Sequence, residues 1–174
     1  MKAAQIPNAE AQTGDVAPAA GTPDAGNPGV RLQASTQQSA ARQRPLILVA
    51  DDEPDIVLVT KTRIQLSGYD VAVAVDGETA LERIRELRPD LVLLDLKMPK
   101  LSGYEVCKTV KADPDLSGTL IMVCSGSSAL GLYPEKHCLQ IGAEGYVRKP
   151  YDVRKLLLEI SRLLAQRKVT GVQP

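Results

Sequence analysis

Four apolar runs of this chain end in side chains that could do chemistry together. Asp51 and Asp52 directly follow the first run, Asp95 ends a second, Ser125 a third and Lys149 a fourth. Carboxylates that crowd together repel, and such a group favours a hard divalent cation. Mg²⁺ suits oxygen ligands where some positions stay open for water. The residue types therefore indicate a magnesium site beside a hydroxyl and an ammonium group.

The same residue types are the ones that phosphoryl transfer requires. A carboxylate can attack phosphorus, and the transfer then depends mainly on positioning and on stabilisation of negative charge. Lys149 would supply a positive charge and Ser125 a hydroxyl donor. Asp95 ends a buried run, where an isolated carboxylate is costly to desolvate. We therefore predict that Asp95 is the residue that becomes phosphorylated.

Each of these residues also has an ordinary structural explanation. Asp52 could cap a helix, Asp95 could end a strand in solvent, and Lys149 could be a solvated side chain. Taken singly, these explanations are at least as good as the functional one. The functional interpretation depends on a fold that brings all of the side chains to one place.

Short apolar runs alternate with helical periodicities from residue 45 onward, and these elements must position the reactive residues. The predicted strands are 45–50, 69–75, 90–95, 119–125 and 144–149. The predicted helices are 55–68, 76–89, 102–113 and 152–168, with a short helix at most near 134–141. Asp76 is a predicted N-cap, and Ser102 with Glu105 forms a predicted capping box.

Five strands alternating with helices predict an α/β fold, a doubly wound five-stranded parallel sheet with helices on both faces. Right-handed crossovers place all strand carboxyl ends at one edge of such a sheet. That edge would gather the acidic, hydroxyl and lysine side chains, and ligands of open α/β sheets bind there.

Composition weighs against several classes of protein. The chain has 174 residues, is 24% charged and has a formal net charge of zero, which gives no support to nucleic-acid binding. No apolar run has membrane-spanning length, and the N-terminus lacks the apolar segment of a signal peptide. Cys107, Cys124 and Cys138 lie at no metal-ligand spacing and are expected to be buried and reduced. We therefore expect a cytoplasmic protein with no nucleic-acid or membrane partner.

The composition changes near residue 45. Residues 1–44 are mostly Ala, Gln, Gly, Pro, Ser and Thr, and cannot bury enough surface to offset their ordering entropy. We predict a disordered tail at 1–44, one domain at 45–168 and a C-terminal tail at 169–174. A true start further into the chain would explain the first segment equally well.

Four motifs resemble the receiver domain of two-component response regulators. They are ILVADDEPDI, DLVLLDLKMPKLSGYEV, the strand end VCS and GAEGYVRKP, and together they cover about residues 45–168. Their combination is highly specific, unlike an acidic pair alone. The resemblance implies a flavodoxin-like fold of the receiver type and a single-domain response regulator, since little chain remains after the last helix for an output domain.

The resemblance implies a role for each matching residue of the acidic group. Asp95 would accept the phosphoryl group, and Lys149 would pair with that group. Asp52 and Asp95 would bind Mg²⁺ directly, together with the backbone carbonyl of Lys97. Asp51 would act mainly through water.

The resemblance also implies a conformational switch. Ser125 would move to the phosphoryl oxygen on activation, and Tyr146 would swing inward behind it. Pro150 would follow a cis peptide bond. A static, half-buried Tyr146 and an ordinary trans Pro150 remain as alternatives.

The implied phosphoryl donor is a sensor histidine kinase or a histidine phosphotransfer protein, and the implied target is an unknown downstream protein. The chain would then be a signalling phospho-acceptor that catalyses its own phosphorylation and dephosphorylation, not an enzyme with a separate substrate. Two alternatives stay open. One is a phosphorelay intermediate that passes the group to a histidine phosphotransfer protein. The other is a phosphorylation-independent binding module, which would be expected to lack Asp95 or Lys149.

The chain departs from the receiver pattern at two places. The segment from Ser125 to Lys149 is a residue or two longer than usual, which leaves the conformation of 126–143 open. Glu144 and Gly145 stand where many transcription-factor receivers carry two acids used in dimer contacts, so the sequence leaves dimerisation through this face open.

Two other classes fit the sequence less well. A phosphatase of the haloacid dehalogenase group would carry a second acid two residues after Asp95, where this chain has Lys97. A dinucleotide or flavin binder would have a glycine-rich first turn, and this chain has ADDEPD there.

Overall fold

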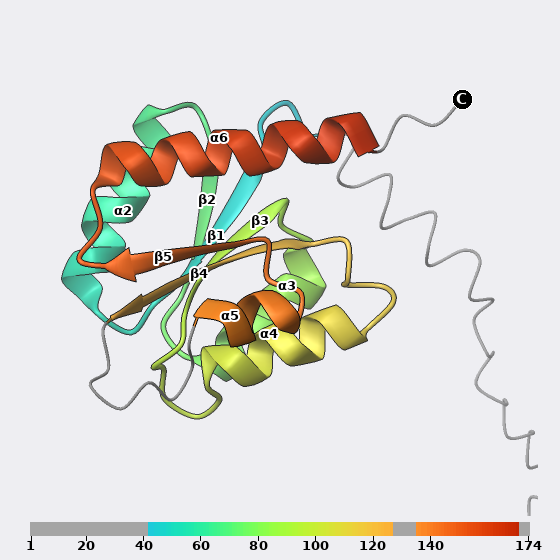
Figure 1. Ribbon diagram of the computed structural model, residues 1–174. Helices are drawn as coiled ribbons and strands as arrows, with labels where there is room; N and C mark the ends of the chain where they lie inside the picture. The colour runs from blue at the N-terminus through green and yellow to red at the C-terminus, as the bar shows by residue number, and fades with distance from the viewer. Residues whose placement is uncertain (1–41, 127–134, 171–174) are drawn as a thin grey trace, which may run out of the picture.

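The computed structural model describes residues 42–126 and 135–170, which form alternating strands and helices (Figure 1). The strands are β1 Leu46–Ala50, β2 Asp70–Ala74, β3 Leu91–Asp95, β4 Leu120–Gly126 and β5 Gly145–Lys149. The helices are α2 Pro54–Leu66, α3 Gly77–Leu87, α4 Gly103–Ala112, α5 Glu135–Gln140 and α6 Val153–Thr170. The predicted α/β fold is confirmed, and every strand and helix starts and ends within two residues of its predicted bounds.

The five strands form one parallel sheet in the order β2-β1-β3-β4-β5. The order reverses between β1 and β3, because the chain leaves β1 toward one edge of the sheet and returns to build the other. In open α/β sheets a ligand crevice forms at the carboxyl ends of the strands at such a switch point. Asp51 directly follows β1 and Asp95 ends β3, so these two carboxylates lie on either side of it.

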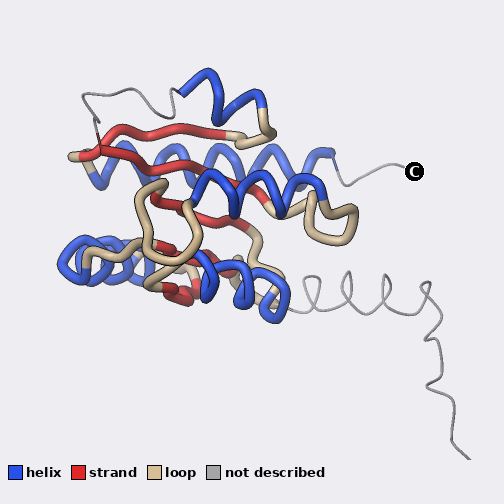
Figure 2. The backbone as a smooth tube through the Cα atoms, turned by 90° about the horizontal axis from the view of Figure 1, so that it is seen from below, coloured by secondary structure: helices blue, strands red, loops and turns tan. Residues whose placement is uncertain are grey.

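Helices cover both faces of the sheet, and each face has its own apolar core. Helices α2 and α6 pack on one face, and α3, α4 and α5 pack on the other. Successive residues of β3 point to opposite faces, so Leu91 and Leu93 belong to the first core and Val92 and Leu94 to the second. Figure 2 shows the strands with helices in front of and behind them. This double burial explains the uninterrupted apolar run of β3.

Side-chain caps fix the starts of helices α3 and α4. Asp76 accepts a hydrogen bond of 2.8 Å from the backbone N–H of Thr79. Ser102 and Glu105 form both hydrogen bonds of a capping box at the start of α4. Both predicted caps are confirmed, and each satisfies backbone donors that the first helical turn leaves without a partner.

The described residues exclude 1–41 and 171–174, which make up most of the two predicted tails. They also exclude 127–134, which is part of the segment 126–143 whose conformation the sequence left open. Helix α6 continues to Thr170, past the predicted domain end at residue 168. Arg42, inside the predicted N-terminal tail, donates hydrogen bonds from its guanidinium to the carbonyls of Leu87 and Arg88. The domain therefore uses at least one residue of that tail.

Two expectations from composition can be compared with the described residues. The cysteines Cys107, Cys124 and Cys138 are free and buried, as predicted. Among the described helices, none is long and apolar enough to cross a membrane.

Candidate functional site

Three carboxylates meet at the switch point of the sheet. Asp51, Asp52 and Asp95 each place one oxygen within 4.8 Å of the others. The closeness follows from strand pairing, because Ala50 of β1 lies opposite Leu94 of β3 and the acids come directly afterwards. Asp51 and Asp95 are buried and Asp52 is exposed. The fold thus supplies an acidic group that is closed toward the core and open on one side.

Lys149 reaches this group from the end of β5. Its Nζ lies 2.7 Å from Oδ2 of Asp51 and 3.4 Å from Oδ2 of Asp95. A third carboxylate oxygen, Oε1 of Glu53, lies 3.3 Å from the same nitrogen. The lysine side chain is only 9% exposed, so its charge is held inside the site. The solvated lysine considered above is therefore wrong for this residue.

Glu53 is a site residue that was assigned no role from the sequence. It follows the acidic pair directly, and its backbone N–H donates a 3.0 Å hydrogen bond to Oδ1 of Asp51. The residue is exposed, and its carboxylate pairs with Lys149 from the solvent side. The only available signal was its position next to Asp52, which many exposed glutamates would share.

Burial and charge act against each other on the phospho-acceptor candidate. Burial raises the pKa of Asp95, and the nearby carboxylate of Asp51 raises it further. The ammonium of Lys149 and the backbone N–H of Lys97 lower that pKa, but they do not cancel the rise. A buried carboxylate that is hard to ionise gains from any additional positive charge at the site.

The same forces act on Lys149 with the opposite outcome. Burial lowers the pKa of this lysine, but the hydrogen bond to Asp51 and the charges of Asp95 and Asp51 outweigh burial. The net shift is upward, so the side chain stays protonated at neutral pH. A permanent ammonium between two carboxylates is suited to bind a transferred anion.

A cavity of about 510 Å³ opens over the acidic group. The residues that line it are Asp52, Glu53, Ile56, Asp95, Lys97, Gly126, Lys149 and Pro150. The possible metal ligands among them are carboxylate and backbone oxygens, the donors that Mg²⁺ prefers. The residues present therefore fit a magnesium ion, with room left for a phosphoryl group.

A glycine lets helix α4 begin directly against the phospho-acceptor candidate. A Cβ added to Gly103 would lie 1.9 Å from the backbone oxygen of Asp95, which no side chain can do. The N–H of Gly103 donates a 3.1 Å hydrogen bond to the carbonyl of Leu96. The loop after Asp95 is therefore short, closed and sterically defined.

The predicted switch residues lie on the two strands beside the acidic group. Ser125 is buried at the end of β4, and its hydroxyl donates a 3.2 Å hydrogen bond to the carbonyl of Gly126. Tyr146 is half-buried on β5 and packs against the core under α3, α4 and α5. The peptide bond between Lys149 and Pro150 is cis.

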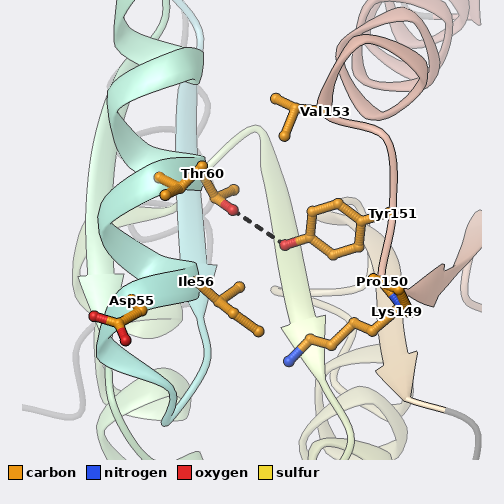
Figure 3. Close-up of a pocket in the computed structure, with 8 residues that line it drawn as sticks. Asp55, Ile56, Thr60, Lys149, Pro150, Tyr151 and Val153 are labelled. Carbon is orange, nitrogen blue, oxygen red and sulfur yellow. Dashed lines mark hydrogen bonds between the residues drawn. The ribbon is translucent and has the colours of Figure 1, made fainter.

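A second, more apolar cavity adjoins the first. It measures about 320 Å³ and lies between α2 and the segment that joins β5 to α6 (Figure 3). Its lining residues are Asp55, Ile56, Val59, Thr60, Lys149, Pro150, Tyr151 and Val153. The Tyr151 hydroxyl and the Thr60 hydroxyl are 3.1 Å apart and form a hydrogen bond that spans the cavity. Sequence reasoning missed this cavity, because its walls come from segments far apart in the chain.

Comparison with known sequences places these features in a family. A sequence model described as "Response regulator receiver domain" matches residues 47–161. The transcriptional regulatory protein PrrA of Mycobacterium tuberculosis is 35% identical over 128 residues, which cover 73% of this chain and 53% of that protein. The alkaline phosphatase synthesis transcriptional regulatory protein PhoP of Bacillus subtilis is 33% identical over 125 residues, covering 72% and 50%. The chain thus spans about half the length of these curated relatives.

Solved structures share the fold. A CheY-like response regulator receiver domain protein from Methanospirillum hungatei is 27% identical, with a TM-score of 0.68 over 74% of this chain and 100% of that one. The signal receiver domain of a putative Luxo repressor protein from Vibrio parahaemolyticus is 25% identical, with a TM-score of 0.67 over 73% and 95%.

Proposed function

This chain belongs to the response regulator receiver domain family, and from that membership we propose that Asp95 accepts a phosphoryl group from a phosphohistidine. The donor would be a sensor histidine kinase or a histidine phosphotransfer protein of the same cell, with this chain in the cytoplasm. One observation carries the proposal: the Lys149 ammonium lies 2.7 Å from Asp51 and 3.4 Å from Asp95 at the wall of an acidic cavity.

In the proposed reaction, a carboxylate oxygen of Asp95 attacks the phosphorus of the donor. The bond between phosphorus and the imidazole nitrogen breaks, and its electron pair stays on that nitrogen. An acyl phosphate forms on Asp95, and later attack by water releases inorganic phosphate and restores the carboxylate. Lys149 would move its contact from the Asp95 carboxylate to a phosphoryl oxygen, so that its charge stabilises the group being transferred.

The acidic group would hold Mg²⁺ through Asp52, Asp95 and the backbone carbonyl of Lys97, with Asp51 acting through water. When bound, the ion supplies positive charge that neutralises the carboxylates and the phosphoryl oxygens. Asp51 has a second role in this scheme, because its hydrogen bond to Lys149 keeps the ammonium aimed at the cavity.

The output of the proposed signal is a change in a partner-binding face. Ser125 and Tyr146 are the proposed switch residues: the Ser125 hydroxyl would leave the carbonyl of Gly126 for the phosphoryl oxygen, and Tyr146 would move inward. The target would be a protein. Relatives about twice as long are named as transcriptional regulators, so the absence of a nucleic-acid partner and a single-domain architecture remain proposals.

Acetyl phosphate is a direct test of the phospho-acceptor. With Mg²⁺ it should phosphorylate the purified protein, and the Asp95→Ala variant should show no shifted band on a phosphate-affinity gel. The control is Asp55→Ala, which removes an exposed acid of α2 next to the site and should leave labelling intact. Normal labelling of Asp95→Ala would overturn the assignment.

A second measurement separates a terminal regulator from a relay intermediate. The phosphorylated protein is mixed with a histidine phosphotransfer protein, and loss of the acyl phosphate is followed over time. A relay intermediate loses the group faster with the phosphotransfer protein than in buffer, and the imidazole of that protein becomes labelled.

A further inference from the structure

The loop that joins Asp95 to helix α4 is hydrogen-bonded to helix α3. It runs from Leu96 to Ser102 and lies against the start of α3. The backbone N–H of Gly77, the first residue of α3, donates a 3.2 Å hydrogen bond to the carbonyl of Pro99. Sequence reasoning gave this loop no role beyond the carbonyl of Lys97.

The close approach of loop and helix requires glycine at residue 77. A Cβ built there would lie 1.9 Å from the backbone oxygen of Leu101 and 2.8 Å from the Cβ of the same residue. Backbone packs on backbone at this point, without side chains between them. The position of the loop is therefore tied to the N-terminus of α3 at short range.

An ion pair lies beside this backbone contact. The Nζ of Lys100 is 2.9 Å from Oδ2 of Asp76, the N-cap of α3, and 3.8 Å from Oε2 of Glu78. The backbone N–H of Thr79 and the Lys100 ammonium lower the pKa of Asp76 to about 2. The Asp76 carboxylate raises the pKa of Lys100, so both partners are charged at neutral pH.

Lys100 has a backbone conformation that disfavours lysine. Its φ is +66°, in the left-handed region where Gly and Asn are the usual residues. A lysine there adds backbone strain that glycine would avoid. The ion pair with Asp76 is a contact that glycine could not make, and its free energy offsets part of that strain.

The other end of the same loop reaches the acidic cavity. The N–H of Lys97 lowers the pKa of Asp95, and Lys97 lines the cavity. Leu96 and Met98 on either side are buried in the core under α3, α4 and α5. The backbone at Lys97 is therefore held between a buried segment and the ion-paired end of the loop.

We propose that the Asp76–Lys100 ion pair is a positioning device for magnesium binding. By holding the loop against α3, the pair keeps the backbone of Lys97 at the edge of the acidic cavity and so strengthens the affinity for Mg²⁺. Neither residue is among the proposed ligands of the ion. This inference rests on the proposed function, in which the acidic group and Lys97 bind Mg²⁺.

The sign of the effect distinguishes positioning from plain electrostatics. Removing a positive charge near an acidic site attracts a cation more strongly, so Coulomb interactions alone predict tighter Mg²⁺ binding after loss of Lys100. The positioning role predicts weaker binding. Its size is limited by the free energy of the contact that is lost, so about threefold is expected for a partly exposed pair.

The test uses Lys100→Gln, which keeps the backbone strain and removes the charge, in the full chain. Its dissociation constant for Mg²⁺, measured by isothermal titration calorimetry, should rise about threefold. Lys100→Arg, which can still pair with Asp76, should bind as the parent does. Lys108→Gln removes an equal charge from the exposed side of α4 and should not weaken binding. Thermal melts in chelator should show that all of these variants are folded.

The outcomes are separable. Equal or tighter binding by Lys100→Gln, with a parent that binds Mg²⁺, would overturn the positioning role and leave the proposed function intact. The positioning role would also be overturned if Lys108→Gln weakened Mg²⁺ binding to the same extent, or if Lys100→Arg bound Mg²⁺ more weakly than the parent. A parent that shows no Mg²⁺ binding would overturn the proposed magnesium site together with this inference.

Discussion

The negative charge of Asp95 destabilises the folded protein. The proposed phosphoryl transfer nevertheless requires that charge. Burial raises the pKa of this carboxyl, which means that the folded state binds its proton more tightly than the unfolded chain does. The linked contribution to stability is fully present below the unfolded pKa, near 3.8, and is lost as pH rises through the folded pKa. At neutral pH the ionised Asp95 carboxylate therefore destabilises the metal-free protein.

We predict that Asp95→Asn raises the melting temperature in chelator. Asn cannot ionise, so the variant does not lose folding stability as the pH rises, whereas the parent does. Asn is also similar in size to Asp, so the substitution leaves no cavity. The gain should be a few degrees at pH 8, roughly 1 kcal/mol for a chain of this length, and smaller at pH 5. Lys149 keeps Asp51 and Glu53 as partners in the variant, so it is not left unpaired.

Thermal melts of parent and variant at several pH values measure this difference. Asp55→Asn serves as the control, since it removes an exposed acid outside the three-carboxylate group. Mg²⁺ at ten times its dissociation constant should stabilise the parent by about 1.4 kcal/mol, and Asp95→Asn should lose most of that rise. A variant that melts below the parent in chelator at pH 8 would contradict the prediction.

Some residues of the site could be predicted from the sequence and others could not. Asp51, Asp52, Asp95 and Lys149 were predictable because each ends or follows an apolar run, and parallel topology brings such ends together. The metal-binding and switch roles of these and the other candidate residues stay predictions. Glu53 was not assigned a role, because its contact with Lys149 depends on a side-chain direction that spacing does not encode.

At the scale of elements, one lysine joins the end of α4 to the sheet. The Nζ of Lys111 lies 2.6 Å from Oε1 of Glu144 and 2.8 Å from the carbonyl of Thr119. The other carboxylate oxygen of Glu144 accepts a 2.7 Å hydrogen bond from the N–H of Ile121. Helix α4, strand β4 and the start of β5 therefore share one polar network.

We predict that Lys111→Met destabilises the protein by about 2 kcal/mol. The thioether keeps most of the apolar stem, but the Glu144 carboxylate and two carbonyls lose a donor in a place that is mostly buried. Urea denaturation measures the change. Lys108→Met, on the exposed side of the same helix, should stay within about 0.5 kcal/mol of the parent. Equal stability of the two variants would refute the role of the network.

Element boundaries were predictable where the chain carries local signals. The N-cap at Asp76 and the capping box at Ser102 depend on residues within one helical turn, and both formed. Glu144 was considered only for its position at a family dimer surface. Its ion pair with Lys111 joins residues far apart in the sequence, and no local sequence pattern predicts such a contact.

For the whole molecule, alternation of apolar runs and helical periods was enough to predict the doubly wound sheet. The strand order was not predicted, and the structure shows that β1 and β3 are neighbours, which brings Asp51 and Asp95 together. The edge of the domain was less predictable. Composition placed it at residue 45, but the guanidinium of Arg42 binds the carbonyls of Leu87 and Arg88 at the end of α3.

The last prediction divides the N-terminal segment at Arg42. Removal of residues 1–41, which lack apolar anchors, should leave the melting temperature unchanged within error. In that shortened chain, Arg42→Gln should lower stability by about 0.5–1 kcal/mol, because the terminal carbonyls of α3 lose a charged donor. Arg44→Gln, at an exposed position, is the matched control and should have no effect. A drop of several degrees on removing residues 1–41 would instead mean that the segment packs on the domain, because its own composition offers no other source of stability.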